Sequence, residues 1–405
     1  MKDINSNAIW GKQMKAIVIG GGIGGLSCAI ALRKAGWEVT VFEQNEKLIE
    51  NGAGIVLAAN AMRALERLDT AGRIRDAGAP IGVAELRTWK GTLLTRLPVE
   101  QQAVRYGTPS YLIHRGTLQS ILHAHSLDLG VTIHLEKRFS ELSESEEGVE
   151  ARFTDGTSAK SELLVAADGY RSKVREQLFG RISLRYSGYK AIRGIGNFED
   201  PRYPLTAGGG FEALGRGTRF GFSHLGGGRI FWFAAINEAE GQEAPLSPEE
   251  RKSRALQKFQ NWYSPVPAVI EATPALHIIT HSIYDLAPLK QWSKGRVTLL
   301  GDAAHPMLPN LGQGGAQAME DAVYLANLLR NRPSGEALAA ALKAFESTRI
   351  PRIRNIIRQS RLMGRLMQLE SPPALAIRNA AFRVAADKLF IARLHPIIGH
   401  EPSTL

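Results

Sequence analysis

Cysteine is almost absent from this sequence, and long apolar runs are absent altogether. Cys28 is the only cysteine among 405 residues, so no intramolecular disulfide can form, as is typical of proteins from reducing compartments. No stretch approaches the roughly 18 uninterrupted apolar residues that indicate a membrane-spanning helix, and residues 1–13 contain no apolar signal-peptide core. We therefore expect a cytoplasmic protein without integral membrane association.

Several patterns of catalytic side chains are missing too. The sequence offers no Ser-His-Asp set, no paired carboxylates and no metal-ligand spacing that would define a reaction. His224 and His305 are isolated histidines, which are more often structural than catalytic. No metal site is expected, and the sequence leaves the catalytic residues, including any general base, unassigned.

Basic residues outnumber acidic ones, but they do not form a long cluster in the sequence. The formal net charge is +11, yet the basic residues are scattered, so we expect a small-molecule partner and no nucleic acid. The charge allows an anionic substrate, and it can equally attract NAD(P)H. One basic face occurs on a helix expected from about Ile350 onward, which Pro372-Pro373 ends. A basic amphipathic helix can lie on a membrane surface, but a solvated face on a helix packed against the body is the favoured interpretation. Its arginines recur at spacings of three and four: Arg354, Arg358, Arg361 and Arg365.

The order of the expected elements indicates an α/β fold. A β-branched run at Lys15–Ile19, a helix at Leu26–Lys34 and a second strand at Val39–Phe42 form a βαβ unit of the size that a dinucleotide-binding fold requires. Two later apolar runs, Leu163–Ala167 and Val297–Leu300, predict further strands of the same sheet. A chain of this length is expected to form two intimately joined domains.

The turn after the first strand carries a dinucleotide-binding fingerprint. Gly20, Gly22 and Gly25 satisfy G-x-G-x-x-G: the first glycine permits the tight turn, the second lets a pyrophosphate approach, and the third lets the helix pack closely. The helix N-terminus then offers free N–H groups to the phosphates. Glu43 ends the next strand, where a carboxylate accepts hydrogen bonds from an adenosine ribose. The fingerprint alone does not distinguish FAD from NAD.

Residues 181–290 have a different character, because aromatic residues alternate there with small or polar ones. Phe220 and Phe222 precede a turn of three glycines, and Phe231 and Phe233 follow it. This period of two predicts a β-hairpin with one aromatic face. We expect the hairpin to belong to a β-rich domain inserted into the first, with its aromatic face packed on a helix or lining a pocket.

Three further motifs resemble those of one family. Gly301-Asp302-Ala303-Ala304-His305-Pro306, continuing to Ala322, resembles the second FAD motif of the flavoprotein aromatic hydroxylases, single-component monooxygenases with the para-hydroxybenzoate hydroxylase fold. Ala167-Asp168-Gly169 resembles the family's D-G motif, and Ile113-His114-Arg115 resembles the helix start where an arginine lies over the flavin cofactor. The resemblance runs from about residue 15 to residue 352 in the family's order and spacing.

The resemblance implies an α/β fold in which a Rossmann-like FAD-binding domain carries an inserted β-sheet substrate domain and C-terminal helices. The implied division assigns residues 1–78, 111–180 and 291–350 to the FAD-binding domain, 79–110 and 181–290 to the substrate domain, and 351–405 to the C-terminal helices. Ten residues are expected to bind the cofactor: Gly20, Gly22, Gly25, Glu43, Gly54, Arg115, Asp168, Asp302, Leu311 and Gly312.

One of these assignments also has an independent physical basis. Leu311 and Gly312 are expected to present backbone N–H groups to the pyrimidine edge of the flavin, and residues 312–329 predict a glycine-rich turn that opens a helix. Reduced flavin carries negative charge near this edge, and a helix N-terminus stabilises such charge by ~0.3–1 kcal/mol at an exposed site. The glycines can equally serve close helix packing, and both roles can hold.

The family chemistry makes an FAD-dependent monooxygenase the predicted function. NADH or NADPH reduces the FAD, and one oxygen atom from O2 enters an aromatic or similarly electron-rich small molecule through a flavin hydroperoxide. Arg219 is a candidate anchor for an anionic group of that molecule. Ile192 stands where the family often has a tryptophan, so no relative's substrate can be assumed. The predicted substrate pocket contains Arg219, Phe222, Phe231, Phe233 and Pro306.

Two other functions stay open. A flavin-dependent reductase or dehydrogenase of a hydrophobic substrate would use the same cofactor domain, and so would a non-catalytic flavin-binding redox module. A flavin halogenase is disfavoured because its W-x-W-x-I-P motif is absent, and a purely NAD-linked dehydrogenase would have no use for the motif at residues 301–322. The sequence also leaves open the choice between NADH and NADPH, and whether the protein is a monomer or a homodimer.

Overall fold

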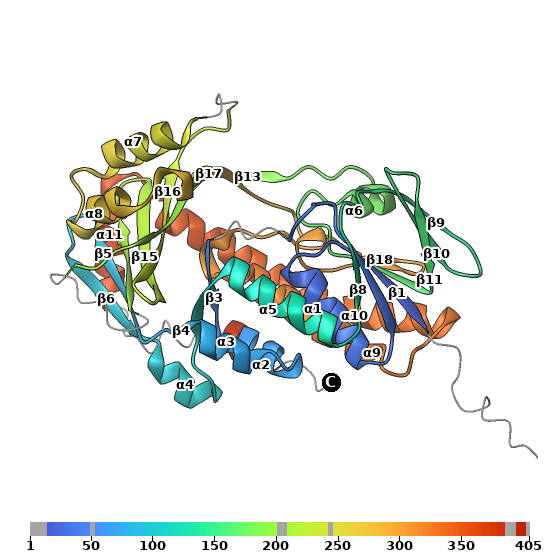
Figure 1. Cartoon of the computed structure of the whole chain (residues 1–405). Coiled ribbons are helices and arrows are strands. Elements are labelled where there is room, and N and C mark those ends of the chain that lie inside the picture. Colours follow the sequence, from blue (N-terminus) through green and yellow to red (C-terminus); the bar gives the residue numbers. More distant parts are fainter. Residues whose placement is uncertain (1–13, 49–52, 201–208, 242–245, 385–393, 402–405) are drawn as a thin grey trace, which may run out of the picture.

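The computed structural model describes residues 14–48, 53–200, 209–241, 246–384 and 394–401. The segment 1–13, on which the expectation about a signal peptide falls, lies outside the described residues, as does part of the expected C-terminal helical region. Figure 1 shows two lobes, each built on one large sheet, with a long helix, α10, reaching from one to the other. In the described part of the chain, no helix is long and apolar enough to cross a membrane.

The first lobe is built on a mostly parallel six-stranded sheet, with the strand order β18-β19-β12-β1-β2-β8. All neighbouring pairs are parallel except β18 with β19. The strands expected from the sequence are therefore confirmed as neighbours in one sheet. Their bounds are β1 Lys15–Ile19, β2 Glu38–Phe42, β8 Thr132–His134, β12 Leu163–Ala166, β18 Ser293–Lys294 and β19 Val297–Leu299.

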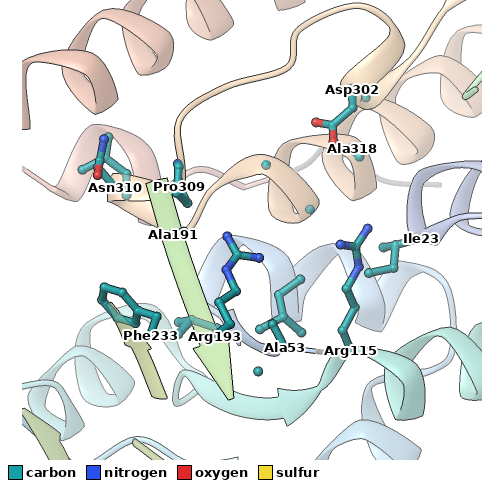
Figure 2. Close-up of a pocket in the computed structure, with 18 of the residues that line it drawn as sticks. Ile23, Ala53, Arg115, Ala191, Arg193, Phe233, Asp302, Pro309, Asn310 and Ala318 are labelled. Atoms are coloured by element: carbon teal, nitrogen blue, oxygen red, sulfur yellow. The ribbon is translucent and has the colours of Figure 1, made fainter. Parts of the chain in front are cut away.

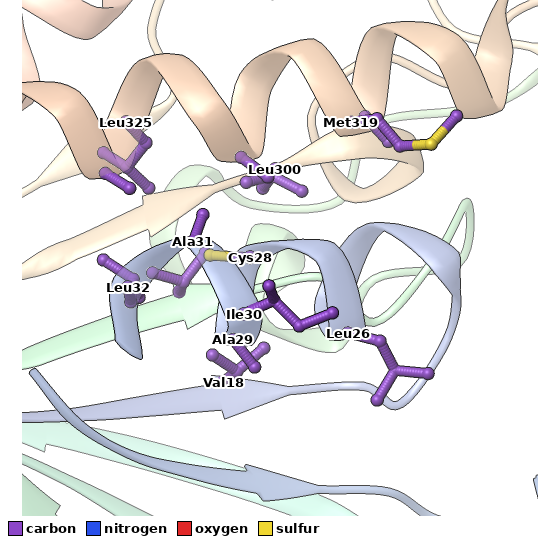
Figure 3. Packing of buried hydrophobic residues seen from close by; sticks show 14 of the residues in the cluster. Val18, Leu26, Cys28, Ala29, Ile30, Ala31, Leu32, Leu300, Met319 and Leu325 are labelled. Carbon is purple, nitrogen blue, oxygen red and sulfur yellow. The ribbon is translucent and has the colours of Figure 1, made fainter. Parts of the chain in front are cut away.

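The core of this lobe lies around helix α1, which spans Ile23–Lys34. The helix begins three residues before the expected start at Leu26, because Gly24 and Gly25 continue it despite their low helix propensity. Figure 3 shows α1 between strand β1 and helix α9 (Gly314–Leu328). Cys28 is fully buried there, and burial raises the pKa of its thiol, so it is a small apolar filler rather than a redox group.

Smaller elements complete the first lobe. Two three-stranded antiparallel sheets have the orders β11-β10-β9 and β3-β7-β4, and the second of these connects the two lobes. The strands are β3 Gly54–Leu57, β4 Ala79–Pro80, β7 Tyr111–His114, β9 Phe139–Glu144, β10 Val149–Phe153 and β11 Ser158–Ser161. The helices are α2 Ala59–Arg67, α3 Ala71–Ala77, α4 Glu100–Tyr106, α5 Arg115–Asp128 and α6 Lys173–Phe179.

The second lobe is built on a seven-stranded sheet with the order β17-β13-β16-β15-β14-β5-β6. Only β14 and β5 run parallel, and helices α7 (Pro248–Phe259) and α8 (Pro265–Ala272) cover one face. Strands from 79–110 and 181–290 thus share one sheet, whereas β4 from the same first segment pairs in the first lobe. The proposed domain division stays a prediction. The strands are β5 Val83–Thr88, β6 Leu93–Pro98, β13 Arg185–Asn197, β14 Gly210–Leu214, β15 Thr218–Gly226, β16 Arg229–Asn237 and β17 Ile278–Asp285.

The predicted hairpin is strands β15 and β16, but the expectation of a single aromatic face is wrong. The register places Phe222 opposite Trp232, and it places Phe233 opposite Gly221. Even-numbered residues therefore share one face and odd-numbered residues share the other, because side chains alternate along each strand. The even-numbered face, with Phe220 and Phe222, packs in the core under α7 and α8, whereas Phe231 and Phe233 lie on the opposite face.

Helix α10 is one continuous helix from Gly335 to Met367. The domain boundary proposed at residues 350/351 falls inside it, although Pro351 removes one backbone hydrogen bond. The helix continues because a buried apolar stripe runs on both sides of the proline, from Leu338 to Ile357. After a break, α11 (Pro372–Val384) begins at the proline pair, where the sequence predicts the end of a helix.

Gly221 gives a test of this packing. A Cβ atom at Gly221 would lie 2.1 Å from the Phe233 ring, so we expect Gly221→Ala to lower the free energy of unfolding by ~1–3 kcal/mol through overpacking. In a Phe233→Ala background the same substitution should cost less than about 0.5 kcal/mol. Urea unfolding of the four apoproteins measures this coupling, and an equal cost in both backgrounds would contradict the contact.

Candidate active site

A cavity of about 520 Å³ lies between the two lobes, within the roughly 300–1,000 Å³ range of small-molecule sites. Its walls are the N-terminal end of α1, strand β3, the segment from 300 to 315, and the odd-numbered face of the seven-stranded sheet. Figure 2 shows this space. Nine of the predicted residues line it: Gly22, Gly54, Arg115, Arg219, Phe231, Phe233, Asp302, Leu311 and Gly312.

The glycine turn forms the wall at the start of α1. Gly20 has a φ of +106°, which favours glycine, and a Cβ at Gly25 would lie 1.9 Å from the carbonyl oxygen of Gly20. A Cβ at Gly22, in contrast, would meet nothing within 4 Å. No side chain caps the helix, so its first N–H groups face open space. This geometry fits the diphosphate of a dinucleotide.

Two predicted cofactor ligands have their carboxylates engaged by the chain itself. Glu43 accepts hydrogen bonds from the backbone N–H of Gly21 at 2.7 Å and from the backbone N–H of Asn45 at 3.0 Å. Asp168 accepts from the backbone N–H groups of Lys173 and Val174 at the start of α6. Neither residue lines the cavity, so their contacts with a cofactor stay predictions.

The opposite wall is formed by short helices and the start of α9. Helix η2 (Gly301–Ala303) carries Asp302, whose exposed carboxylate has no partner among the described residues. Helix η3 (Pro309–Leu311) leads through Gly312, with a φ of +61°, into α9, whose N-terminus no side chain caps. The first residues of α9 line the cavity, and their contact with the flavin stays a prediction. Pro306 is buried behind this wall and does not line it.

A buried ionic cluster lies behind the start of α9. Arg349 of α10 donates through Nε to Asp321 at 2.7 Å and through a terminal nitrogen to Glu320 at 2.7 Å. The second oxygen of Asp321 accepts from the backbone N–H of Gly301 at 3.3 Å and contacts Nε2 of His305 at 2.5 Å. His305 thus belongs to this cluster and does not line the cavity, so it has a structural role.

The seven-stranded sheet contributes a cavity wall of which the sequence predicted only some residues. Odd-numbered residues of β13 and β16 face the cavity, and Phe231 lies so close to Gly54 that a Cβ there would be 2.7 Å from its ring. Phe222 faces away, in the core and beside a second cavity. The sequence analysis missed five of the wall residues: Tyr189, Ala191, Arg193, Glu212 and Ala235.

The Arg219 guanidinium has several partners among the described residues. Its guanidinium donates to Glu212 at 3.1 Å and to Asn310, and it lies over the rings of Tyr189 and Phe233. Asn310 also accepts from the Tyr189 hydroxyl at 3.2 Å. Arg219 is therefore a buried member of a polar group at the cavity wall, and its charge is already paired with Glu212.

Arg193 and Arg115 differ from Arg219 because neither guanidinium has a hydrogen bond or ion pair with any described residue, although their backbone groups are paired. Both point into the cavity in Figure 2, on the same side and across from Asp302 and Asn310. Burial, and then the like charge of Arg115, lower the pKa of Arg193 to about 10. Burial and both arginines lower the pKa of the neighbouring His281 to about 4, so that histidine is neutral at pH 7.

Comparison with known proteins now identifies the family. A family model described as an FAD binding domain matches residues 13–360. The chain belongs to this FAD-binding family. It is 37% identical over 382 residues to the aurachin C monooxygenase/isomerase of Stigmatella aurantiaca, covering 94% of this chain and 96% of that protein. It is 32% identical to the 3-amino-4-hydroxybenzoate 2-monooxygenase of Streptomyces cremeus, covering 95% of each.

Comparison with solved structures agrees with this assignment to the FAD-binding family. Klebsiella pneumoniae HpxO, solved with FAD and uric acid, has a TM-score of 0.88 and 29% identity, covering 97% of this chain and 98% of that one. The predicted fold class, the FAD cofactor and the FAD-dependent monooxygenase class are confirmed, with NAD(P)H and O2 as the co-substrates of that class. The reductase and non-catalytic alternatives receive no support.

The two glycines of the α1 turn allow a paired test. Gly22→Ala places a methyl group in open space, so the apoprotein should unfold at the wild-type temperature while FAD affinity falls, because the methyl occupies the phosphate approach. Gly25→Ala creates a clash with backbone, so the apoprotein itself should lose ~1–3 kcal/mol. Thermal unfolding and FAD titration separate the two effects, and unchanged FAD affinity in Gly22→Ala would count against phosphate binding there.

The buried cluster gives a stability test. Arg349→Met leaves Asp321 without an arginine partner and leaves Glu320 with Arg352 as its remaining arginine, so we expect a loss of ~3–5 kcal/mol in the free energy of unfolding. Arg349→Lys keeps the positive charge but loses the planar set of guanidinium donors, so its free energy of unfolding should lie between those of the wild type and Arg349→Met. Arg354→Met removes an exposed arginine of the same helix and should stay within about 0.5 kcal/mol. Equal losses at positions 349 and 354 in urea unfolding would refute the cluster's role.

Proposed function

We propose that this monooxygenase hydroxylates a small aromatic compound that carries a negative charge, and that Arg193 anchors the charged group. The observation that carries the proposal is the guanidinium of Arg193, which faces the cavity without a carboxylate partner. A half-buried cation without a counter-ion is unfavourable, so an anionic ligand that pairs with it is bound more favourably. Arg219, the anchor expected from the sequence, is already paired with Glu212.

The arrangement of the walls supports this assignment. Arg193 lies opposite Phe233 in the sheet register, so an aromatic ring resting on Phe231 and Phe233 would bring an acidic substituent within reach of the guanidinium. A carboxylate or phenolate accepts charge-assisted hydrogen bonds from arginine, and these also fix the orientation of the ring. The phenylalanines offer no hydrogen-bonding group, which keeps water out of the reacting space.

The cofactor is proposed to occupy the remainder of the cavity. When bound, FAD supplies the oxygen-transfer chemistry, and the protein supplies position and charge. The glycine turn at Gly20, Gly22 and Gly25 would receive the diphosphate, and the start of α9 would face the flavin edge. The remaining proposed contacts follow the family pattern: ribose at Glu43, flavin beside Gly54, phosphate or ribityl groups at Arg115, Asp168 and Asp302, and the pyrimidine edge at Leu311 and Gly312.

The names of similar proteins are consistent with an acidic aromatic substrate. The Streptomyces cremeus relative is named for 3-amino-4-hydroxybenzoate, which is an aromatic carboxylate, and HpxO was solved with uric acid. We extend only the chemical class to this chain. A cytoplasmic location and the absence of a nucleic-acid partner belong to the same proposal, and they rest on composition and scattered charge. The proposal leaves open whether the protein is a monomer or a homodimer.

A ligand pair that differs in charge tests the anchor. For the FAD-loaded protein at pH 7, we expect tighter binding of 4-hydroxybenzoate than of 4-hydroxybenzamide, measured by perturbation of the flavin absorbance. Arg193→Met should weaken benzoate binding by about 10- to 150-fold, since a hydrogen bond to a charged group contributes ~1.5–3 kcal/mol. Benzamide binding and FAD affinity should hardly change.

Arg216→Met is the matched control, because Arg216 is exposed and outside the cavity. It should leave both affinities at the wild-type values. Equal wild-type affinities for the benzoate and the benzamide would overturn the proposed anionic substrate. A drop in FAD affinity without a change in ligand preference would instead assign Arg193 to the cofactor.

A further inference from the structure

The sheet face that forms the active-site wall continues beyond the cavity. Side chains on this face alternate along β14, β5 and β6, and the register places Ala84 beside both Gly210 and Leu97. Leu86 lies beside Glu212 in the same way. The face therefore changes from polar and aromatic over β13 and β16 to aliphatic over β5 and β6.

A second cavity of about 280 Å³ lies over this aliphatic part. Met363 and Met367 at the C-terminal end of α10 cover it from the other side. It shares four lining residues with the active-site cavity, so the two spaces adjoin: Glu212, Phe233, Asn310 and Leu311. Its lining also includes Phe211 and Phe222, which the register places on the other face of the sheet.

The part of the second cavity's lining that solvent can reach is mostly apolar. Val83, Ala84, Leu97, Phe211 and Met363 are only half-buried, so their apolar surface stays in contact with solvent. Covering such surface with an apolar ligand group is favourable. The one charged lining residue besides Glu212 is Glu85, and its carboxylate is already paired with two arginines, Arg87 and Arg96.

We propose that this second cavity holds an apolar extension of the substrate whose reactive ring lies in the first cavity. The inference rests on the proposed function and makes the substrate class narrower: an acidic aromatic head with a hydrocarbon tail. Phe233 and Leu311 lie at the junction, where the tail would pass. Three strand spacings of roughly 4.8 Å separate β16 from β5, so a tail of about 14 Å can follow the sheet face.

The position of the polar residues supports a head and tail arrangement rather than two independent ligands. Arg193 lies in the first cavity and not in the second, so an anion held there orients the rest of the molecule. Glu212 is neutralised by Arg219 at the boundary, which leaves no free charge in the path between the cavities. A hydrocarbon chain can therefore cross the boundary without desolvating an unpaired ion.

The test is a ligand series with one head and a growing tail. For the FAD-loaded protein, 3-n-alkyl-4-hydroxybenzoates from methyl to octyl are titrated against the flavin absorbance. We expect the Kd to fall about fourfold for each added methylene until the cavity is filled. Ala84→Phe, which fills the second cavity from its floor, should remove this dependence on chain length while leaving the Kd of unsubstituted 4-hydroxybenzoate unchanged.

Leu93→Phe is the matched control, because Leu93 is exposed on the neighbouring strand β6 and lines neither cavity. It should reproduce the wild-type series. Equal wild-type Kd values across the series, or an equal effect of Ala84→Phe on short and long chains, would overturn the proposal. Such a result leaves the benzoate–benzamide comparison intact, so failure of the tail site and failure of the anionic head site are distinguishable.

Discussion

The buried charges around Arg349 are the constraint on which the active site depends. They join α10 to α9, and through Asp321 they also hold the backbone of Gly301 at the beginning of the cavity wall formed by residues 300 to 315. Glu320 extends the cluster to α2 through Asn60 at 2.6 Å. Burying ions is unfavourable unless every charge is paired in good geometry, and here each of the two carboxylates has several partners. An apolar core would pack as densely, but it would not specify where the loop backbone lies.

The consequence appears on the side of the wall that faces the cavity. That surface is made largely of backbone and glycine, at Gly312 and the first turn of α9, so it has few side chains of its own to fix its shape. The position of this wall therefore has to be fixed by the buried ionic cluster behind it. The same logic holds for the glycine turn of α1, whose shape is set by Gly20 and Gly25 packing on each other rather than by side chains at the surface. Both helix N-termini are therefore preorganised by groups that never reach the cavity.

The sequence could predict the parts of the site that are local in the chain. The glycine turn, the strand that ends at Glu43 and the helix after Gly312 depend on neighbouring residues, and their spacing identifies them. The partner of a strand residue depends on register across distant segments, so sequence alone could not show that Arg219 meets Glu212 and Asn310 while Arg193 meets no carboxylate. The two-faced hairpin was missed for the same reason, because alternation within each strand says nothing about which residues lie opposite.

The hairpin of β5 and β6 has a separate significance. It comes from a segment between two parts of the first lobe, joins the sheet through the single parallel pairing with β14, and contributes side chains to the second cavity but none to the first. Mutations in this short stretch therefore replace no residue that lines the first cavity. The lining of the second cavity can thus be altered separately from that of the first, so directed evolution aimed at the proposed tail site should begin in this hairpin.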